Sequence, residues 1–165
     1  MTDRRTFLLS GAALLAATTP AFASKTGENG TFEVMKTPEE WKAILTENQY
    51  LVLREEKTER AFTSPLDKNT AEGIYHCAGC DNPLYSSETK FDSGTGWPSF
   101  WAPIEGKVGT KDDFSWLGRR RTEVHCARCG GHQGHVFDDG PKPTGKRHCI
   151  NGLALTFKPS GATTG

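Results

Sequence analysis

The chain has 165 residues, a length that fits one domain. Its 20 Lys and Arg residues are balanced by 20 Asp and Glu residues, so no basic surplus remains to neutralise phosphates or to attract an anionic membrane. Nucleic acid is therefore not an expected partner, and no membrane association is expected of the mature form.

The first 23 residues have the features of an export signal. Arg4-Arg5 precedes Phe7-Leu8 and a run of small and apolar residues at 10–17, and Ala21-Phe22-Ala23 has the small side chains that a signal peptidase needs, so we expect cleavage after Ala23. The arginine pair resembles a twin-arginine signal, which exports folded proteins; an ordinary secretory signal is the alternative. We expect a periplasmic protein whose mature net charge stays close to zero.

A short helix is predicted near 38–47. Thr37 can cap the free amide groups, Pro38 suits the first helical position, and Glu40 completes a capping box. Apolar residues then follow at the spacing of one helical face. These residues are Trp41, Ile44 and Leu45.

The rest of the chain predicts a mostly β domain over 36–159 with one or two N-terminal helices. Gly and Pro recur every few residues, and the periodic segments between them are short. Residues 24–35 are expected to form a flexible lead-in, and 160–165 a disordered tail. Strands are expected at Gly73–His76, Leu84–Ser86, Glu123–His125 and Arg147–Phe157.

Two Cys-x-x-Cys pairs predict a metal site. Cys77 and Cys80 enclose Ala-Gly, and Cys126 and Cys129 enclose Ala-Arg. A tight turn with two intervening residues puts both sulfurs on one side, so two such turns supply four thiolates to a tetrahedral ion. Because a four-sulfur shell has no open position, we expect a structural Zn²⁺ that contributes to folding.

Three alternatives stay open for these four cysteines. Each pair could be a redox dithiol, although a thioredoxin-type pair begins a helix and these pairs follow strands. The four could form two disulfides, which an exported location favours. A nucleic-acid finger is disfavoured because the gap from Cys80 to Cys126 is longer than in a compact zinc ribbon. Export of a folded chain favours zinc, since the metal binds before the thiols reach an oxidising compartment.

Cys149 is left over if the other four cysteines bind metal. A single cysteine is more often a small buried apolar residue than a nucleophile. Its neighbours indicate a site, because Arg147, Cys149 and Asn151 share one face of an extended strand. The cation favours the thiolate, and Asn151 supplies a donor beside it. We therefore predict that Cys149 is reactive.

Two further blocks hold candidate site residues. The Gly-rich segment 130–141 is expected to form a loop of closely packed backbone that presents His132 and His135. Two histidines three residues apart fit metal ligands, structural residues or an acid/base pair. In the other block, Gly-Trp-Pro is expected to hold Trp97 in a rigid turn, where an indole is more often core than binding surface.

Taken together, these blocks resemble the methionine sulfoxide reductase B family. The resemblance is carried by Gly-Trp-Pro-Ser-Phe, Gly-His-x-Gly-His-Val-Phe-x-Asp-Gly-Pro, Arg-x-Cys-x-Asn and the two Cys-x-x-Cys pairs, and it covers about Trp41 to Pro159. It implies a fold of two antiparallel β-sheets with short N-terminal helices. It also implies reduction of the R epimer of methionine sulfoxide, chiefly in proteins.

The resemblance assigns roles to individual residues. Cys149 would be the attacking thiolate, and oxygen transfer would leave it as a sulfenic acid. His132 and His135 match active-site histidines that help to bind and protonate the sulfoxide oxygen. Three more residues match a substrate-side asparagine, the basic residue before the nucleophile and the ring that receives the methyl group, in this order: Asn151, Arg147 and Trp97.

The sequence departs from the family's pattern in two places. Many members have a cysteine before Gly-Trp-Pro that resolves the sulfenic acid, whereas this chain has Thr95. We therefore expect an external thiol or a thioredoxin-like protein to reduce Cys149. The expected substrates are oxidised proteins, and the enzyme is expected to be a monomer. His148 and Gly152 replace the Tyr and Ser of many members, which could alter reductant docking or the lifetime of the sulfenic acid.

Two other functions remain open. A cysteine hydrolase using Cys149 and His135 would need an orienting third group and an oxyanion hole, neither of which the sequence identifies. A non-enzymatic zinc module that binds another protein would leave the Cys149 strand as plain core, with an inert thiol.

Overall fold

The computed structural model describes residues 32–114, 118 and 120–161. The predicted export signal (1–23) and residues 162–165 of the predicted tail lie outside this part of the chain. Within the described residues, no helix is long and apolar enough to cross a membrane.

Residues 32–35, expected at the end of a flexible lead-in, contact the folded domain. The ring of Phe32 meets the imidazole of His125 edge-on, with ring centroids 5.8 Å apart. The N–H of Val34 donates to the carbonyl of Arg128 at 3.0 Å. This part of the lead-in therefore belongs to the domain.

The N-terminal helical region forms α1 (Pro38–Ile44) and α2 (Glu47–Glu55). The predicted capping box of Thr37 and Glu40 is confirmed, and Thr46 and Gln49 form a second one that ends the predicted helix early. Because Leu45 is extended between the helices, it turns inward and is buried, as is Trp41. Ile44, predicted on the same apolar face, is 55% exposed, so that assignment is wrong.

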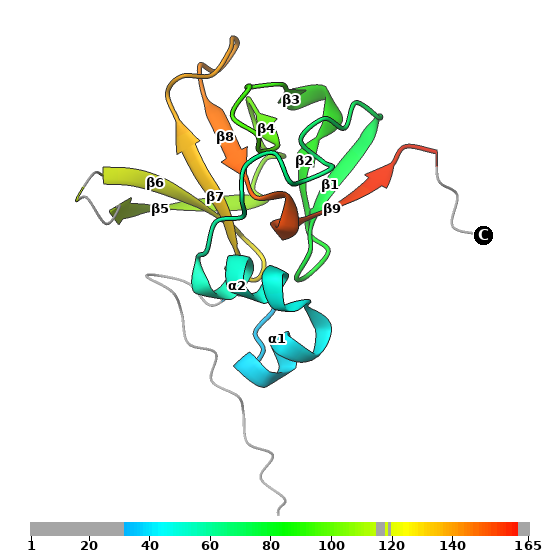
Figure 1. Ribbon diagram of the computed structural model, residues 1–165, viewed down its shortest axis with the longest axis vertical. Helices are drawn as coiled ribbons and strands as arrows, with labels where there is room; N and C mark the ends of the chain where they lie inside the picture. Colours follow the sequence, from blue (N-terminus) through cyan, green and yellow to red (C-terminus); the bar gives the residue numbers. More distant parts are fainter. Residues whose placement is uncertain (1–31, 115–117, 119, 162–165) are drawn as a thin grey trace, which may run out of the picture.

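The strands of the described residues form two antiparallel sheets, which confirms the predicted fold class (Figure 1). The smaller sheet has the order β2-β1-β9, and the larger one β3-β4-β8-β7-β6-β5. The helices α1 and α2 lie at one end of the molecule, where α2 contacts β7 of the larger sheet. The strands are β1 (Gly73–Cys77), β2 (Pro83–Ser86), β3 (Lys90–Phe91), β4 (Ser99–Phe100), β5 (Val108–Phe114), β6 (Arg120–Cys126), β7 (His132–Phe137), β8 (Arg147–Ile150) and β9 (Leu155–Pro159).

Two sequence-based assignments around the candidate site are wrong. The predicted strand Arg147–Phe157 is broken by the 3-10 turn η2 (Gly152–Ala154), so β8 and β9 belong to different sheets. The predicted loop 130–141 contains β7, the central neighbour of β8. Its close backbone packing is nevertheless confirmed, because a Cβ on Gly134 would lie 2.0 Å from the carbonyl oxygen of Cys149.

An aromatic cluster fills the space between the two sheets. Tyr75 meets Phe100 edge-on with centroids 5.0 Å apart, and Tyr85 stacks on Phe100 at 4.3 Å. His148 points into this core from β8, with its Nδ1 3.3 Å from the hydroxyl of Tyr85. Burial lowers the pKa of His148 to about 4, and Lys146 adds to the effect, so the imidazole is neutral at neutral pH. His148 therefore belongs to the buried core and not to the exposed surface.

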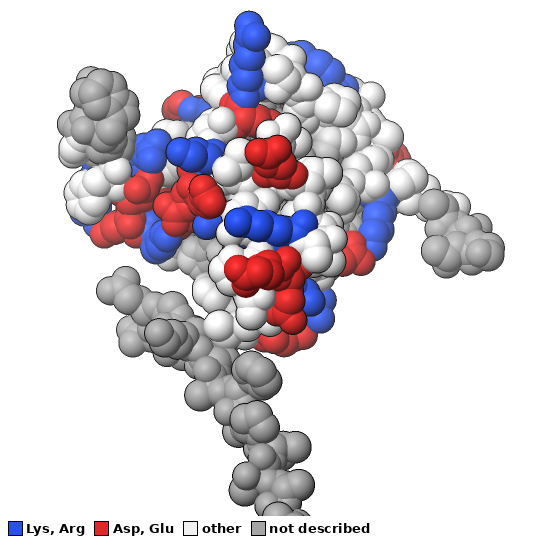
Figure 2. All heavy atoms as spheres, turned by 60° about the horizontal axis from the view of Figure 1, so that its bottom comes forward, with Lys and Arg blue, Asp and Glu red and all other residues white. Residues whose placement is uncertain are grey.

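Charges on the surface are paired rather than segregated. Figure 2 shows Lys and Arg interspersed with Asp and Glu over the face that it presents. Cross-strand ion pairs join β5 to β6 and the two arms of the β7–β8 hairpin. These pairs are Asp112–Arg120, Asp113–Arg121, Asp138–Lys146 and Asp139–Arg147.

Candidate active site and metal centre

The two Cys-x-x-Cys pairs form matching turns at the ends of β1 and β6. In the first, the N–H of Asp81 donates to the carbonyl of Cys77 at 2.8 Å; in the second, the N–H of Gly130 donates to that of Cys126 at 2.9 Å. Asp81 and Gly130, each four residues after the first cysteine, both have positive φ, 60° and 68°. The sequence echo therefore corresponds to a repeated local structure.

The four sulfurs of these turns come together and could hold a metal ion. All lie within 4.8 Å of one another, with Cys77 Sγ 3.7 Å from Cys129 Sγ and Cys80 Sγ 3.6 Å from Cys126 Sγ. A tetrahedron with metal–sulfur bonds of about 2.3 Å requires sulfurs about 3.8 Å apart, whereas a disulfide requires about 2.05 Å. The spacing therefore fits a shared ion and not the two disulfides that the sequence left open.

Two amides near this centre donate toward its sulfurs. The Nδ2 of Asn82 lies 3.4 Å from Cys126 Sγ, and the Nε2 of Gln133 lies 3.6 Å from Cys77 Sγ. Such donors offset part of the negative charge that four thiolates bring into a buried place. Gln133 belongs to β7, so the metal centre also touches the strand that carries both histidines.

Cys149 lies in the middle of a row of side chains that crosses the large sheet. It is paired directly with His135 of β7 on one side and with Ser99 of β4 on the other. Directly paired residues of antiparallel strands point to the same face with Cβ atoms about 5 Å apart. The predicted alternation is confirmed within β8, where Arg147 and Cys149 are half-buried and His148 and Ile150 are buried.

A pocket of about 200 Å³ opens beside Cys149. It brings together four of the predicted site residues: Trp97, His135, Cys149 and Asn151. Sequence reasoning missed the remaining lining residues, which are Thr58, Arg121, Gly134 and Phe137. Arg147 and His132 do not line the pocket but contact residues that do: Arg147 lies over the ring of Phe137, and the ring of His132 packs edge-on against that of His135.

The thiol of Cys149 responds to two opposing influences. Burial raises its pKa, while the guanidinium of Arg147 and the hydroxyl of Thr95 lower it through charge and hydrogen bonding. Burial is the larger influence, so the pKa of Cys149 is above its ordinary value in the free protein. The predicted effect of Arg147 has the right sign, but it does not prevail.

Arg147 is itself held in place by a carboxylate and an aromatic ring. Its Nε and Nη2 donate to Asp139 at 2.8 and 2.7 Å, and its guanidinium lies 4.6 Å from the ring centroid of Phe137. This pairing raises the pKa of Arg147, so it keeps its positive charge beside Cys149. Opposite charges at both ends of the Gly140–Gly145 turn were a sequence signal for the pair.

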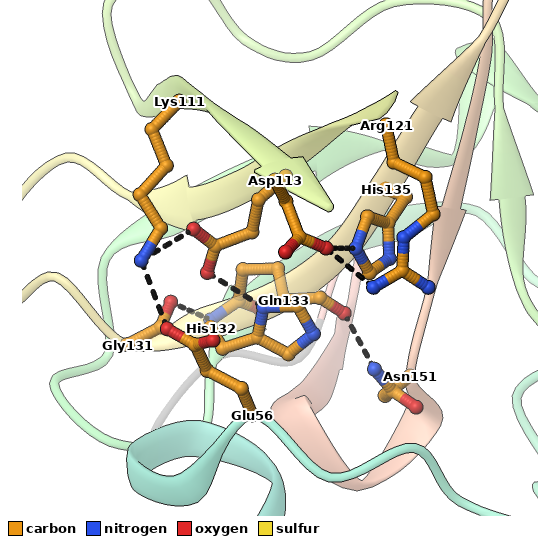
Figure 3. A network of polar contacts seen from close by, with 10 residues as sticks. Glu56, Lys111, Asp113, Arg121, Gly131, His132, Gln133, His135 and Asn151 are labelled. Atoms are coloured by element: carbon orange, nitrogen blue, oxygen red, sulfur yellow. Dashed lines mark hydrogen bonds and ion pairs between the residues drawn. The ribbon is translucent and has the colours of Figure 1, made fainter. Parts of the chain in front are cut away.

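His135 is hydrogen-bonded to a carboxylate two strands away. Its Nε2 lies 2.8 Å from Oδ2 of Asp113, which also accepts from Arg121 (Figure 3). Burial lowers the pKa of His135, and the hydrogen bond to Asp113 opposes that effect. Arg121 and Asp113 were missed because only the pairing of β5, β6 and β7 brings them close to His135.

His132 lies on the same side of β7 as His135 because the strand has a bulge. The pairing of β6 with β7 shifts between Val124 and His125, which leaves Gln133 without an opposite residue and turns both histidines to one side. Their ring centroids are 5.4 Å apart. His132 is 2% exposed, its Nδ1 lies 2.6 Å from Oε1 of Glu123, and its Nε2 has no hydrogen-bond partner among the described residues.

Glu123 connects this buried imidazole to the surface. Its Oε2 lies 2.9 Å from Nζ of Lys111. The same Nζ lies 2.8 Å from Oε1 of Glu56, and Lys111 points toward Glu56 in Figure 3. Although burial alone would raise the pKa of Glu123, its contacts with His132 and Lys111 hold that pKa below the ordinary value. The carboxylate therefore stays negative beside His132.

Comparisons with known proteins agree with this arrangement. The SelR domain model matches residues 45–159, most of the chain. Proteins named peptide methionine sulfoxide reductase MsrB from Agrobacterium fabrum and Leptospira interrogans are 51% and 52% identical over 127 residues, which cover 77% of this chain and 94% and 97% of theirs. The chain belongs to the MsrB family and contains a SelR domain.

A plant MsrB relative is longer than this chain. Peptide methionine sulfoxide reductase B1, chloroplastic, from Oryza sativa is 56% identical over 122 residues, which cover 74% of this chain and 57% of the rice protein. The chain therefore spans little more than half the length of that relative.

A chain of hydroxyl groups lies beside Cys149. The hydroxyl of Thr95 is among the groups that lower the pKa of the Cys149 thiol. The Ser93 hydroxyl continues the chain, 2.8 Å from that of Thr95 and 2.7 Å from that of Ser99. The residue before Gly96 therefore lies next to the candidate nucleophile.

Proposed function

We propose that this protein reduces methionine sulfoxide to methionine, with Cys149 as the nucleophile. The observation that carries the proposal is the pocket in which the Cys149 thiol, the His135 imidazole and the Trp97 indole meet. Its volume is below that of sites for drug-sized ligands and suits one side chain. Family membership supports the same reaction, because the bacterial relatives are named for it.

The residue types match the chemistry of sulfoxide reduction. The Cys149 thiolate attacks the sulfoxide sulfur while a proton moves to the sulfoxide oxygen, and the oxygen passes to Cys149. The sulfoxide is reduced to the thioether, and Cys149 is oxidised to a sulfenic acid. His135, which is paired directly with Cys149, is the proposed proton donor, and the ring of His132 packs against that of His135. The indole of Trp97 gives the apolar S-methyl group an aromatic wall.

Cys149 is returned to the thiol by an external reductant. The other four cysteines lie together at the metal centre, and Thr95 has no sulfur with which to resolve the sulfenic acid. One reductant thiol attacks the sulfenic acid and releases water, and a second thiol then displaces Cys149 as its thiol and leaves the reductant as a disulfide. A small dithiol or a thioredoxin-like protein has this chemistry.

The metal at the four-cysteine centre is Zn²⁺ in this proposal. Four thiolates at tetrahedral spacing are its usual structural ligands, and the closed shell leaves no position for substrate. The ion would connect the end of β1 in the small sheet to the end of β6 in the large one and stabilise the fold.

The R epimer in oxidised proteins is the proposed substrate, on the strength of the family resemblance. The test is a dithiothreitol-driven assay on peptides that carry either epimer, with the wild type and Cys149→Ser. The proposal expects thioether formation from the R epimer only and none in the variant. Full activity in Cys149→Ser, or turnover of neither epimer, would overturn it.

A cysteine hydrolase gains one supporting contact, since Asp113 could orient His135 as a third group. Among the described residues, however, no hydrogen bond joins Cys149 to His135, and the aromatic wall of Trp97 suits a methyl group. Ester or amide cleavage that is lost in Cys149→Ser would favour the hydrolase. An inert Cys149 thiol, with no turnover of either kind, would favour a non-catalytic module.

We also propose export to the periplasm through the signal at 1–23. The support is the arginine pair and the cleavage pattern at Ala23. N-terminal sequencing of the protein from fractionated cells, with an Arg4→Lys, Arg5→Lys variant as control, tests this. Mature protein starting at Ser24 in the periplasm is expected, and full-length chain in the cytoplasm would contradict it.

A further inference from the structure

Glu59 contacts the proposed substrate-binding residues Trp97 and Asn151 and also the turn η2 that follows Asn151. It follows α2 in a loop whose neighbouring residue, Thr58, lines the pocket, and it is 8% exposed. Its Oε1 accepts from the N–H of Gly152 at 2.5 Å, and its Oε2 accepts from the N–H of Leu153 at 3.0 Å. Both amides belong to η2, which begins directly after Asn151, so the carboxylate anchors the exit from the site.

The main chain of Glu59 reaches the proposed contacts themselves. Its N–H donates to Oδ1 of Asn151 at 3.0 Å, and its carbonyl accepts from Nε1 of Trp97 at 3.2 Å. Nδ2 of Asn151 donates to the carbonyl of Gln133 at 3.0 Å, so the amide is held at both ends. One residue thus connects the indole wall to the substrate-side amide.

Gly152 leaves no room for a side chain at the start of η2. A Cβ there would lie 1.8 Å from Oγ and 2.5 Å from Cβ of Ser64, while Oε1 of Glu59 would lie 3.3 Å away. The neighbour that requires a glycine at this position is therefore Ser64, and the Glu59 carboxylate lies just beyond it.

Burial of the Glu59 carboxylate, taken by itself, is unfavourable for the free energy of folding. Burial raises the pKa of Glu59, and the hydrogen bonds from Gly152 and Leu153 only oppose that effect. The ionised carboxylate has two acceptor oxygens, so it accepts from both amides at once. A neutral amide side chain of similar shape has only one acceptor oxygen and cannot do this.

We propose that Glu59 is a positioning residue for the substrate pocket, because its side chain fixes η2 and its main chain then fixes Trp97 and Asn151 relative to each other. It does not touch the substrate. The inference rests on the proposed reduction of methionine sulfoxide, and it adds a residue from outside the pocket to that reaction.

The experiment compares Glu59→Gln and Glu59→Asp with the wild type in the dithiothreitol-driven assay. Gln keeps the shape but replaces one acceptor by a donor, and Asp keeps the charge but is too short to reach both amides. Glu88→Gln, the same change at an exposed carboxylate, is the matched control. KM for a methionine-R-sulfoxide peptide, kcat, the melting temperature and the rate of Cys149 alkylation are measured for each.

Glu59→Gln and Glu59→Asp are expected to raise KM at least about fivefold and to change kcat less than about twofold. Alkylation of Cys149 should keep its wild-type rate, and Glu88→Gln should match the wild type throughout. A merely destabilised protein would lose kcat through a smaller active fraction at unchanged KM. That result, or wild-type KM in a folded Gln or Asp variant, overturns this inference alone. No turnover in the wild type overturns the proposed function and this inference together.

Discussion

Nε2 of His135 lies 2.8 Å from Oδ2 of Asp113, although the two residues come from β7 and β5 with β6 between them. The same carboxylate accepts from Arg121. Without Asp113, His135 would face burial and the positive charge of Arg121, both of which lower its pKa. The carboxylate thus helps the imidazole to keep the proton that the proposed reaction uses.

Asp113→Asn should move the loss of activity on the alkaline side to lower pH. Activity that needs protonated His135 falls as pH rises through its pKa, and the variant lowers that pKa further. The fall is about tenfold for each pH unit above the pKa. Profiles of kcat/KM against pH test this, with Asp112→Asn as control for an exposed neighbour. An unshifted or upward-shifted limb would mean that Asp113 does not support His135.

Arg147→Gln should slow the reaction of Cys149 with iodoacetamide at pH 8. The guanidinium is the nearest cation that lowers the pKa of the thiol, so its removal leaves burial unopposed on that side. The midpoint of the alkylation rate against pH should rise. Arg120→Gln, which breaks a similar ion pair on the exposed surface, serves as control. An equal midpoint in both variants would remove Arg147 from the activation of Cys149.

Thr95→Cys should form a disulfide with Cys149 during turnover without added reductant. The hydroxyl of Thr95 is close enough to the thiol to lower its pKa, so a sulfur at this position should reach the sulfenic acid. Mass spectrometry of non-reduced peptides detects the link. Ser93→Cys, one residue further along the hydroxyl chain, is the matched control. If Thr95→Cys gives no link, that loop does not resolve the sulfenic acid.

Removing the metal should unfold the protein rather than only inactivate it. The ion would hold the two sheets together at the ends of β1 and β6, and structural zinc contributes about 10 kcal/mol or more in small zinc domains. Cys126→Ser or a strong chelator should therefore abolish cooperative unfolding and release one zinc per chain, measured by circular dichroism and metal analysis. Cys149→Ser should keep the metal and the melting temperature. A folded, metal-free Cys126→Ser would contradict a structural role.

Acid should destabilise the protein in part through His148. Burial lowers the pKa of His148 to about 4, so between about pH 6.5 and 4 the unfolded chain binds a proton that the folded chain does not. Stability therefore falls as pH drops through this window, by about 3 kcal/mol from this group. Urea unfolding of the wild type and His148→Phe at pH 7 and 4.5 measures the difference. Equal pH dependence in both would contradict it.

Local patterns predicted the parts of this protein that depend on neighbouring residues. The Cys-x-x-Cys turns, the capping box at Thr37 and the alternation around Cys149 each involve a few consecutive positions, and the structure confirms all three. The fold class followed from the family resemblance, and the structure confirms it as well.

Features that depend on pairing of distant strands could not be predicted in this way. The contact of Asp113 with His135 follows from the register of β5, β6 and β7, which no local pattern specifies. The segment of His132 and His135 was assigned to a loop because its glycines resemble turn residues, whereas they allow close packing of β7 on β8. Glu59 carries no motif, and only the folded chain brings it to η2.

The central claim is that Cys149 takes the oxygen of the sulfoxide. A single-turnover reaction tests it most directly: reduced protein is mixed with one equivalent of a methionine-R-sulfoxide peptide, without added thiol, and a sulfenic-acid probe such as dimedone is then added. We predict one thioether product and one probe adduct per chain, located on Cys149. Product formed with the adduct on another cysteine, or product formed with Cys149 still a free thiol, would contradict the account.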